Sequence, residues 1–181
     1  METNLCVAGF GGQGVMTLGK FLADATCSST DKKVTFFPSY GAEQRGGTAN
    51  CYVVISDDDI GAPLGDVMDD LIVMNGASLQ KFLKVLKPGG TLFLNSSIVT
   101  GDVDRSDVTV VKAPVTELAL EMGSAKVLNV IMLGVYVGYT EVIAPEIVWQ
   151  TVEHKLAGKP KLMPLNRLAF DRGLELGRAQ R

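Results

Sequence analysis

The chain has 181 residues, of which 46% are hydrophobic and 20% are charged, a composition typical of a folded globular protein and not of a disordered segment. Its formal net charge is −3 and its basic residues form no dense cluster, which argues against nucleic-acid binding. The N-terminus lacks a signal-peptide pattern. The most apolar later run, residues 127–139, is shorter than the ~20 residues that span a bilayer and is expected to be a buried helix. We therefore expect a cytoplasmic protein.

Short apolar, β-branched runs alternate with helical patterns along the first two thirds of the chain, which predicts an α/β fold. In chain order we expect a strand at 4–8, a helix at 14–28 and strands at 33–37, 48–56 and 70–75. A helix at 76–86, ended by the turn KPGG at 87–90, precedes strands at 90–95 and 107–113. The remaining pattern is helical, at 114–122, 125–139, 145–156 and 164–179. Residues 1–181 are thus predicted to form one layered domain with a mostly parallel sheet flanked by helices and a helical C-terminal third.

The motif GFGGQG lies between the first expected strand and the first expected helix and satisfies the pattern GxGxxG. Glycines there permit positive φ angles, and a helix N-terminus offers free N–H groups and a partial positive charge. This combination predicts a phosphate or carboxylate site. Its residues are Gly11, Gly12, Gln13 and Gly14. The alternative is a tight strand-to-helix turn that binds no ligand.

A free-standing nucleotide-binding enzyme is a second interpretation of this glycine loop. A dinucleotide site also needs an Asp or Glu at the end of the second strand to hold the ribose hydroxyls. That strand is expected to be stopped by Pro38, and only Phe37 and Ser39 flank this proline, while Asp31 precedes the strand. The nicotinamide-dinucleotide interpretation therefore lacks its second support.

The stretch SYGAEQRGGTANC, residues 39–51, follows the second strand and carries an unusual set of polar residues. Arg45 offers a planar, always-charged fork that matches phosphate or carboxylate, and Glu43 is placed to pair with it or to accept hydrogen bonds across an interface. Because loops that follow parallel strands emerge at one edge of the sheet, we expect this loop to lie beside the glycine loop. Its candidate residues are Tyr40, Glu43, Arg45, Gly46 and Gly47. The alternative is a surface turn held by a Glu43–Arg45 salt bridge, which contributes only about 0–1 kcal/mol.

With both loops in view, the chain resembles the gamma subunit of the 2-oxoacid:ferredoxin oxidoreductases. The resemblance is carried by GFGGQGVMTLGKFLADA (9–25), PSYGAEQRGGTANCYVVISD (38–57), DIGAPLGDVMDDLIVMN (59–75) and KVLNVIMLG (126–134). The form SYGxExRGGTANC is most similar to members that act on 2-oxoglutarate and related 2-oxoacids. Gly76 departs from the pattern, because relatives often carry glutamine there.

The resemblance implies a multi-subunit enzyme that cleaves a 2-oxoacid with thiamine diphosphate, passes electrons through iron–sulfur clusters to ferredoxin, and delivers the acyl group to coenzyme A. This chain has no GDG…NN thiamine diphosphate motif, and its three cysteines have no cluster spacing. Both cofactors are therefore expected in alpha, beta and delta partner subunits, and the isolated chain is expected to be inactive. The two loops are expected to form a rim that faces coenzyme A. The alternative is a noncatalytic assembly module.

Four further positions carry separate expectations. Asn129 lies on an apolar helix face, and because a buried amide needs partners it is expected to fasten that helix to a backbone loop such as the glycine loop. His154 is expected at the surface and Trp149 in the core or an interface. The acidic run 57–59 is expected to cap a turn, with cation binding as the alternative.

Overall fold

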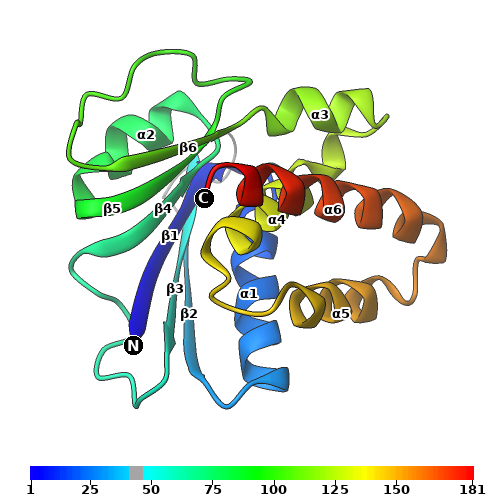
Figure 1. The fold of residues 1–181 in the computed structure, drawn as a ribbon, viewed down its shortest axis with the longest axis horizontal. Helices are drawn as coiled ribbons and strands as arrows, with labels where there is room; N and C mark the ends of the chain where they lie inside the picture. The colour runs from blue at the N-terminus through cyan, green and yellow to red at the C-terminus, as the bar shows by residue number, and fades with distance from the viewer. Residues whose placement is uncertain (41–46) are drawn as a thin grey trace.

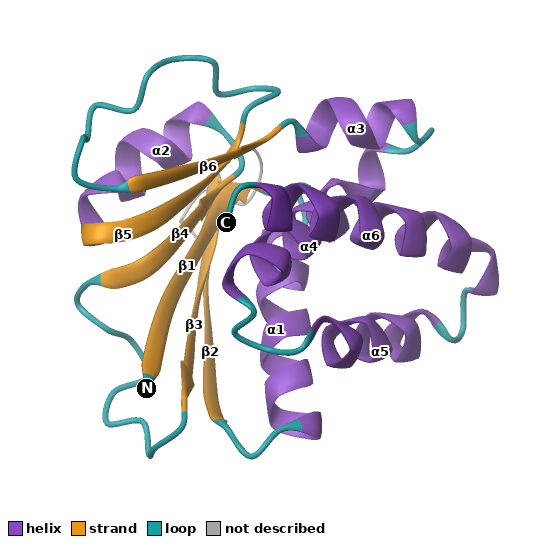
Figure 2. Cartoon of the chain, viewed as in Figure 1, coloured by secondary structure: helices purple, strands orange, loops and turns teal. Residues whose placement is uncertain are grey.

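A computed structural model describes residues 1–40 and 47–181 of the chain, which form a six-stranded sheet with helices on both faces (Figures 1 and 2). The strands are β1 (Glu2–Phe10), β2 (Lys33–Tyr40), β3 (Thr48–Ser56), β4 (Met68–Val73), β5 (Leu86–Asn95) and β6 (Thr109–Ala113). The helices are α1 (Val15–Ser29), α2 (Gly76–Phe82), α3 (Val115–Glu121), α4 (Leu128–Thr140), α5 (Pro145–Leu156) and α6 (Met163–Ala179). Three 3-10 turns join them: η1 (Leu83–Val85), η2 (Ala125–Val127) and η3 (Pro160–Leu162).

The sheet has the order β2-β3-β1-β4-β5-β6 and is mostly parallel, as the sequence predicted. Strands β1, β4, β5 and β6 pair in parallel, whereas β3 runs antiparallel to both β1 and β2. Because β3 is antiparallel to both of its neighbours, β1 and β2 run in the same direction as each other. The carboxyl ends of β1, β2, β4, β5 and β6 therefore share one edge of the sheet.

Two predicted boundaries were wrong. Pro38 does not end β2, which continues to Tyr40, because β2 is an edge strand and a proline there costs no ladder hydrogen bond. The stretch KPGG is not a turn outside the sheet but lies within β5, and the preceding helix ends earlier, at Phe82. Gly89 adopts a φ of 76° beside the register shift between β4 and β5, a conformation that favours glycine.

The main core lies between the sheet and the layer formed by α1, α3, α4, α5 and α6, while α2 covers the other face (Figure 1). The expected buried helix is α4, whose residues from Leu128 to Gly138 are all buried. Trp149 of α5 packs on Phe170 of α6 with ring centroids 5.8 Å apart, which confirms its core position. No helix in the described ranges combines the length and apolar character needed to cross a membrane.

Helices α4 and α6 touch through their backbones. A Cβ added to Gly134 of α4 would lie 2.4 Å from the carbonyl oxygen of Phe170, and one added to Gly173 of α6 would lie 2.1 Å from that of Ile131. Gly138 and Gly177 repeat the same contact one turn further along. This close packing fixes α4, and with it Asn129 at the N-terminal end of α4, relative to α6.

Candidate functional site

The glycine loop forms a tight turn between β1 and α1. The Gln13 N–H donates to the Phe10 carbonyl oxygen at 3.1 Å, and Gly12 has a φ of 93°. Gly14 is the N-cap of α1 in the left-handed conformation, with φ 72°, and no side chain caps the helix. The first helical hydrogen bond is donated by Leu18 to the Gly14 carbonyl, so the N–H groups of the preceding residues have no partner within the helix.

The Gln13 side chain holds this turn against the neighbouring strand. Its Oε1 accepts hydrogen bonds from the Phe10 N–H at 2.8 Å and from Asn75 Nδ2 at 3.0 Å, and its Nε2 donates to the Met74 carbonyl at 3.2 Å. A Cβ on Gly9 would lie 2.8 Å from Gln13 Oε1, so the motif's first glycine makes room for this amide. The side chain of Gln13 is thus engaged within the fold, and the loop's backbone faces outward.

Two asparagines in this network were missed by the sequence analysis. Asn75 Oδ1 accepts from the Ser78 N–H at 2.8 Å and caps α2, while Asn95 Nδ2 donates to the Met74 carbonyl at 3.2 Å and to Thr116 Oγ1 at 2.9 Å. Each of them stands at the carboxyl end of an expected strand, at 70–75 and 90–95. Asparagine at the end of successive apolar strands was the signal available in the sequence.

Asn129 reaches the glycine loop, as predicted. Its Nδ2 donates to the Gly14 carbonyl oxygen at 3.4 Å, and its side chain is only 8% exposed. A Cβ on Gly14 would lie 2.5 Å from this nitrogen. Gly14 therefore serves two purposes, since it permits the positive φ and leaves space for the α4 amide.

A cavity of about 330 Å³ opens beside the loop, and we call it the glycine-loop cavity. Its lining joins Gly12, Gln13 and Gly14 to η2, to the first turn of α4 and to Asn166 of α6. Lys126 is the one charged residue of its described lining. Hydrogen-bond donors with one positive charge suit an anionic group, whereas the described lining offers no acid–base pair for catalysis.

The second loop is described only at its two flanks. Glu43, Arg45 and Gly46 lie outside the described residues, while Gly47 is a half-buried bend before β3. Tyr40 and Gly9 are both paired with Ala49 of β3. The ends of β1 and β2 are therefore two strand spacings apart, about 10 Å, at the same edge of the sheet.

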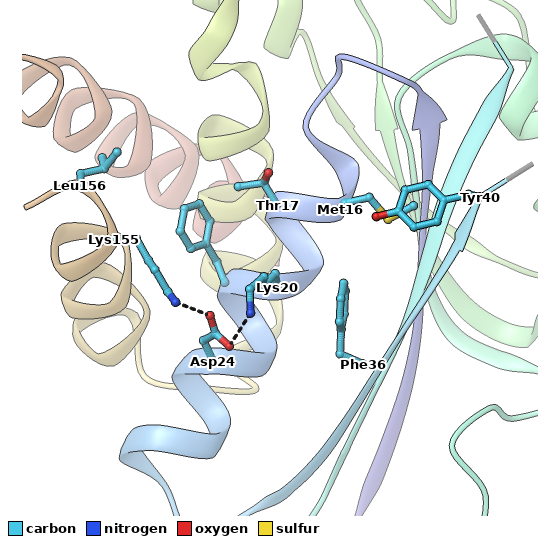
Figure 3. Close-up of a pocket in the computed structure, with 9 residues that line it drawn as sticks. Met16, Thr17, Lys20, Asp24, Phe36, Tyr40, Lys155 and Leu156 are labelled. Atoms are coloured by element: carbon cyan, nitrogen blue, oxygen red, sulfur yellow. Dashed lines mark hydrogen bonds and ion pairs between the residues drawn. The ribbon is translucent and has the colours of Figure 1, made fainter. Parts of the chain in front are cut away.

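Tyr40 lines a second cavity of about 370 Å³, the α1–β2 cavity (Figure 3). Its walls are Met16, Thr17, Lys20, Phe21 and Asp24 of α1, Phe36 and Tyr40 of β2, and Lys155 and Leu156 of α5. Thr17, Phe21 and Leu156 also line the glycine-loop cavity. The first turns of α1 thus separate two adjacent hollows, with Gly12–Gly14 in one and Tyr40 in the other.

Asp24 joins two lysines at the α1–β2 cavity. Its carboxylate lies 3.2 Å from Lys20 Nζ and 3.0 Å from Lys155 Nζ (Figure 3). Burial alone would raise the pKa of Asp24, but the hydrogen bonds from Lys155 and Lys20 outweigh it and lower that pKa. The carboxylate therefore stays ionised, and the three groups carry a net charge of +1.

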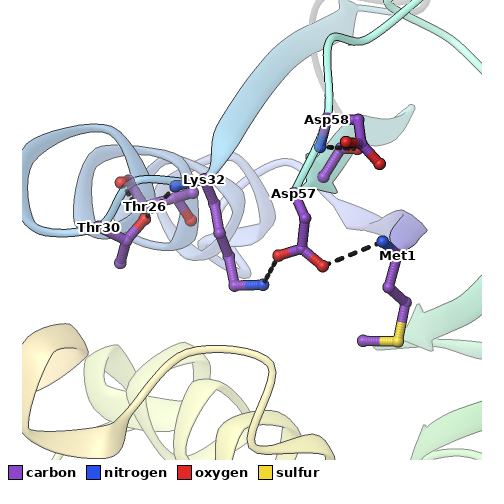
Figure 4. A network of polar contacts seen from close by, with 7 residues as sticks. Met1, Thr26, Thr30, Lys32, Asp57 and Asp58 are labelled. Carbon is purple, nitrogen blue, oxygen red and sulfur yellow. Dashed lines mark hydrogen bonds and ion pairs between the residues drawn. The ribbon is translucent and has the colours of Figure 1, made fainter.

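The remaining candidates lie away from both cavities or are explained by structure. Asp57 pairs with the N-terminal amine of Met1 at 3.0 Å and with Lys32, so its carboxylate makes two ion pairs among the described residues and not the turn cap expected of it (Figure 4). His154 is exposed, as predicted. Burial raises the pKa of Cys51 to about 12, so this thiol stays protonated. In the two described ranges, His, Cys, Asp and Glu side chains form no group of three placed to hold a metal ion.

Residues 4–176 match the family model described as pyruvate ferredoxin/flavodoxin oxidoreductase. The chain belongs to this family. Ketoisovalerate oxidoreductase subunit VorA of Methanothermobacter thermautotrophicus is 36% identical over 98% of this chain but only 37% of its own length. 2-Oxoglutarate synthase subunit KorC of Methanocaldococcus jannaschii is 31% identical over 98% of this chain and 95% of its own. The chain thus spans about a third of VorA and nearly all of KorC.

Solved structures agree with this assignment. The gamma subunit of a keto/oxoacid ferredoxin oxidoreductase from Geobacter sulfurreducens superposes with a TM-score of 0.88 at 26% identity, over 99% of this chain and 98% of that one. A chain of the 2-oxoglutarate:ferredoxin oxidoreductase from Magnetococcus marinus has a TM-score of 0.92 at 24% identity, over 99% of this chain and 32% of that one. The resemblance to the gamma subunits is confirmed, and the second comparison shows the shared fold.

Proposed function

We propose that this chain is the gamma subunit of a multi-subunit 2-oxoacid:ferredoxin oxidoreductase, and that its loops form part of a rim facing coenzyme A. One observation carries the proposal: in a chain of this family, the glycine loop at the start of α1 lines a cavity whose one charged residue in the described lining is Lys126. Coenzyme A carries phosphate groups, which suit a helix N-terminus and a nearby ammonium group. Gly11, Gly12, Gly14, Tyr40, Glu43, Arg45, Gly46 and Gly47 are the proposed rim residues, and Gln13 holds the rim in shape.

Thiamine diphosphate, the iron–sulfur clusters and the contact with ferredoxin belong to alpha, beta and delta subunits in this proposal. The names of the relatives support a divided enzyme, since VorA and KorC are both called subunits. The Magnetococcus marinus structure was solved with 2-oxoglutarate, coenzyme A and succinyl-CoA bound. On this account the chain is inactive when isolated. It functions within the complex, in the cytoplasm.

The proposed substrate is 2-oxoglutarate, on the strength of the SYGxExRGGTANC form. The relatives are named for different acids: ketoisovalerate, 2-oxoglutarate and pyruvate. Comparing the rates of ferredoxin reduction by the assembled complex with these three acids tests this part of the proposal. A rate with ketoisovalerate or pyruvate above that with 2-oxoglutarate contradicts it.

The sheet order weighs against the free-standing nucleotide enzyme. In a dinucleotide fold the second strand lies beside the first and parallel to it, which brings its terminal carboxylate to the ribose. Here antiparallel β3 lies between β1 and β2, and β2 ends in Ser39 and Tyr40. The parallel neighbour of β1 is β4, which leads into Met74 and Asn75 and carries no acid at that end.

Calorimetric titration separates the proposed function from the free-standing nucleotide-binding enzyme. Coenzyme A and NAD are titrated into the isolated chain and into the assembled complex. The proposal predicts binding of coenzyme A to the complex and no tight NAD binding by the chain alone. Tight NAD binding by the isolated chain would favour the nucleotide enzyme.

Arg45→Ala tests the ligand role of the second loop, with Arg178→Ala at the exposed end of α6 as the matched control. Because a guanidinium pairs with phosphate through two hydrogen bonds, we expect the apparent KM for coenzyme A to rise about tenfold while assembly stays intact. An unchanged KM removes the ligand role. Loss of assembly instead indicates that the loop contacts only partner subunits.

A further inference from the structure

The outer edge of β2 has a defined pattern of backbone groups. Pro38 has no N–H and lies opposite Cys51, so this pair belongs to the non-hydrogen-bonded positions of the antiparallel ladder. Positions alternate along such a ladder, and Val34, Phe36 and Tyr40 therefore also direct their N–H and C=O groups away from β3. The outer edge thus offers donors and acceptors at alternate residues, interrupted by one missing donor at Pro38.

These outward groups have no partner among the described residues, whereas the opposite edge of the sheet is covered. At β6, the Gln180 side chain accepts a hydrogen bond from the Lys112 N–H at 3.0 Å and donates one to the Lys112 carbonyl at 2.9 Å. Sheet edges with unpaired backbone groups are templates for another strand, and proteins usually cover or shorten them. Of the two edges, β6 has five residues and a side-chain cap, while β2 has eight residues.

The open edge runs alongside the α1–β2 cavity. Phe36 and Tyr40 line that cavity, so a strand added to β2 would place every second side chain on the same face, over the cavity (Figure 3). Its volume of about 370 Å³ and its walls of Met16, Phe21 and Leu156 suit an apolar side chain.

The charged side chains at the α1–β2 cavity favour an added segment that carries a carboxylate. Lys20 and Lys155 share the single carboxylate of Asp24, so this surface is positive in a chain whose net charge is −3. An approaching carboxylate is attracted to the net charge of +1 that these three groups carry.

We propose that the outer edge of β2 receives an extended segment of a partner subunit by β-strand addition, with an apolar side chain in the α1–β2 cavity and a carboxylate near Lys20 and Lys155. This inference rests on the proposed function, because it needs the assembled complex. The lengths of the relatives support such a partner: this chain aligns with 37% of VorA and 32% of the Magnetococcus marinus chain, where further polypeptide is joined to this fold.

Residue-resolved hydrogen exchange in the isolated chain and in the assembled complex tests the inference. The amides of Val34 and Phe36 should exchange rapidly in the isolated chain and slow at least about tenfold in the complex, because strand addition gives them carbonyl partners. The amides of Thr35 and Phe37, which face β3, should be slow in both samples. This alternation distinguishes strand addition from general shielding of the surface.

Unchanged exchange at Val34 and Phe36 in a complex that forms and uses coenzyme A overturns the inference and leaves the proposed function intact. Failure of the chain to assemble with alpha and beta subunits overturns both. Protection that appears in the isolated chain as its concentration rises also overturns it, because a second copy of the chain would then occupy the edge.

A charge reversal adds a second test. Lys155→Glu should weaken binding of the chain to its partner subunits about tenfold, with Lys84→Glu on η1, against the other face of the sheet, as the matched control. Lys20→Glu should act in the same direction, and thermal unfolding of the isolated variants checks that each still folds. Equal affinities for the Lys155→Glu and Lys84→Glu chains contradict the proposed carboxylate partner.

Discussion

Replacing Gly14 with alanine tests how the glycine loop is built. The substitution forces a Cβ into a position with φ 72°, which costs a non-glycine residue about 1–2 kcal/mol. The new Cβ would also lie 2.5 Å from Asn129 Nδ2, so the amide must leave the Gly14 carbonyl. A buried amide left without its partner costs about 1–3 kcal/mol more. We expect Gly14→Ala to lower the free energy of unfolding by about 2–5 kcal/mol in urea titrations of the isolated chain.

A double-mutant cycle separates the two contributions. In an Asn129→Ala background the two closest contacts, with the amide nitrogen and Cγ, are removed and only the contact with the Cβ of residue 129 at 2.9 Å remains, so Gly14→Ala should cost less than it does in the wild-type chain. Gly76→Ala is the control, because Gly76 has no positive φ and no atom within 4 Å of the added Cβ. Strict additivity of the two substitutions, or equal effects of Gly14→Ala and Gly76→Ala, would refute the contact described between α4 and the loop.

Two further predictions concern the core. Gly134→Ala should lower the free energy of unfolding by about 1–3 kcal/mol, because its Cβ would push α4 from α6; a melting temperature equal to that of Gly76→Ala would argue against this contact. Burial raises the pKa of Asp70 to about 6, despite the hydrogen bond from Tyr136 Oη at 3.0 Å. The folded-state pKa exceeds the ordinary value of 3.8, so as pH rises the unfolded chain releases the Asp70 proton at a lower pH than the folded chain does. The free energy of unfolding therefore falls as pH rises from about 4 to about 6. Asp70→Asn should therefore stabilise the protein by on the order of 2–3 kcal/mol near neutral pH and have little effect near pH 4, and a pH-independent difference in the urea midpoint would contradict this.

Local patterns in the sequence predicted the order and type of the elements. The helix α5 begins at Pro145 and ends at Leu156, as its start signal and apolar spacing indicated. Asn129 was predicted to reach the glycine loop because a single amide on an apolar helix needs hydrogen-bond partners, which the backbone of a loop can supply.

Features that depend on the order of the strands in the sheet could not be predicted from the sequence. The partner of Gln13 is Asn75, which is 62 residues away along the chain and becomes its neighbour because β4 pairs with β1. Pro38 indicated the end of a strand, and only the edge position of β2 shows why the strand continues through it. The insertion of β3 between β1 and β2 likewise has no local signature, whereas its antiparallel orientation to β2 could have been predicted, because residues 38–47 are too few for a parallel crossover.

The most direct test of the central claim is the affinity of the assembled complex for coenzyme A when the glycine-loop cavity loses its positive charge. Lys126→Glu reverses that charge, and Lys84→Glu makes the same change on η1, away from the loop. We predict a dissociation constant for coenzyme A about tenfold higher with Lys126→Glu than with Lys84→Glu, and an unchanged affinity for the 2-oxoacid. Equal dissociation constants for coenzyme A in the two variant complexes would contradict a rim that faces this ligand.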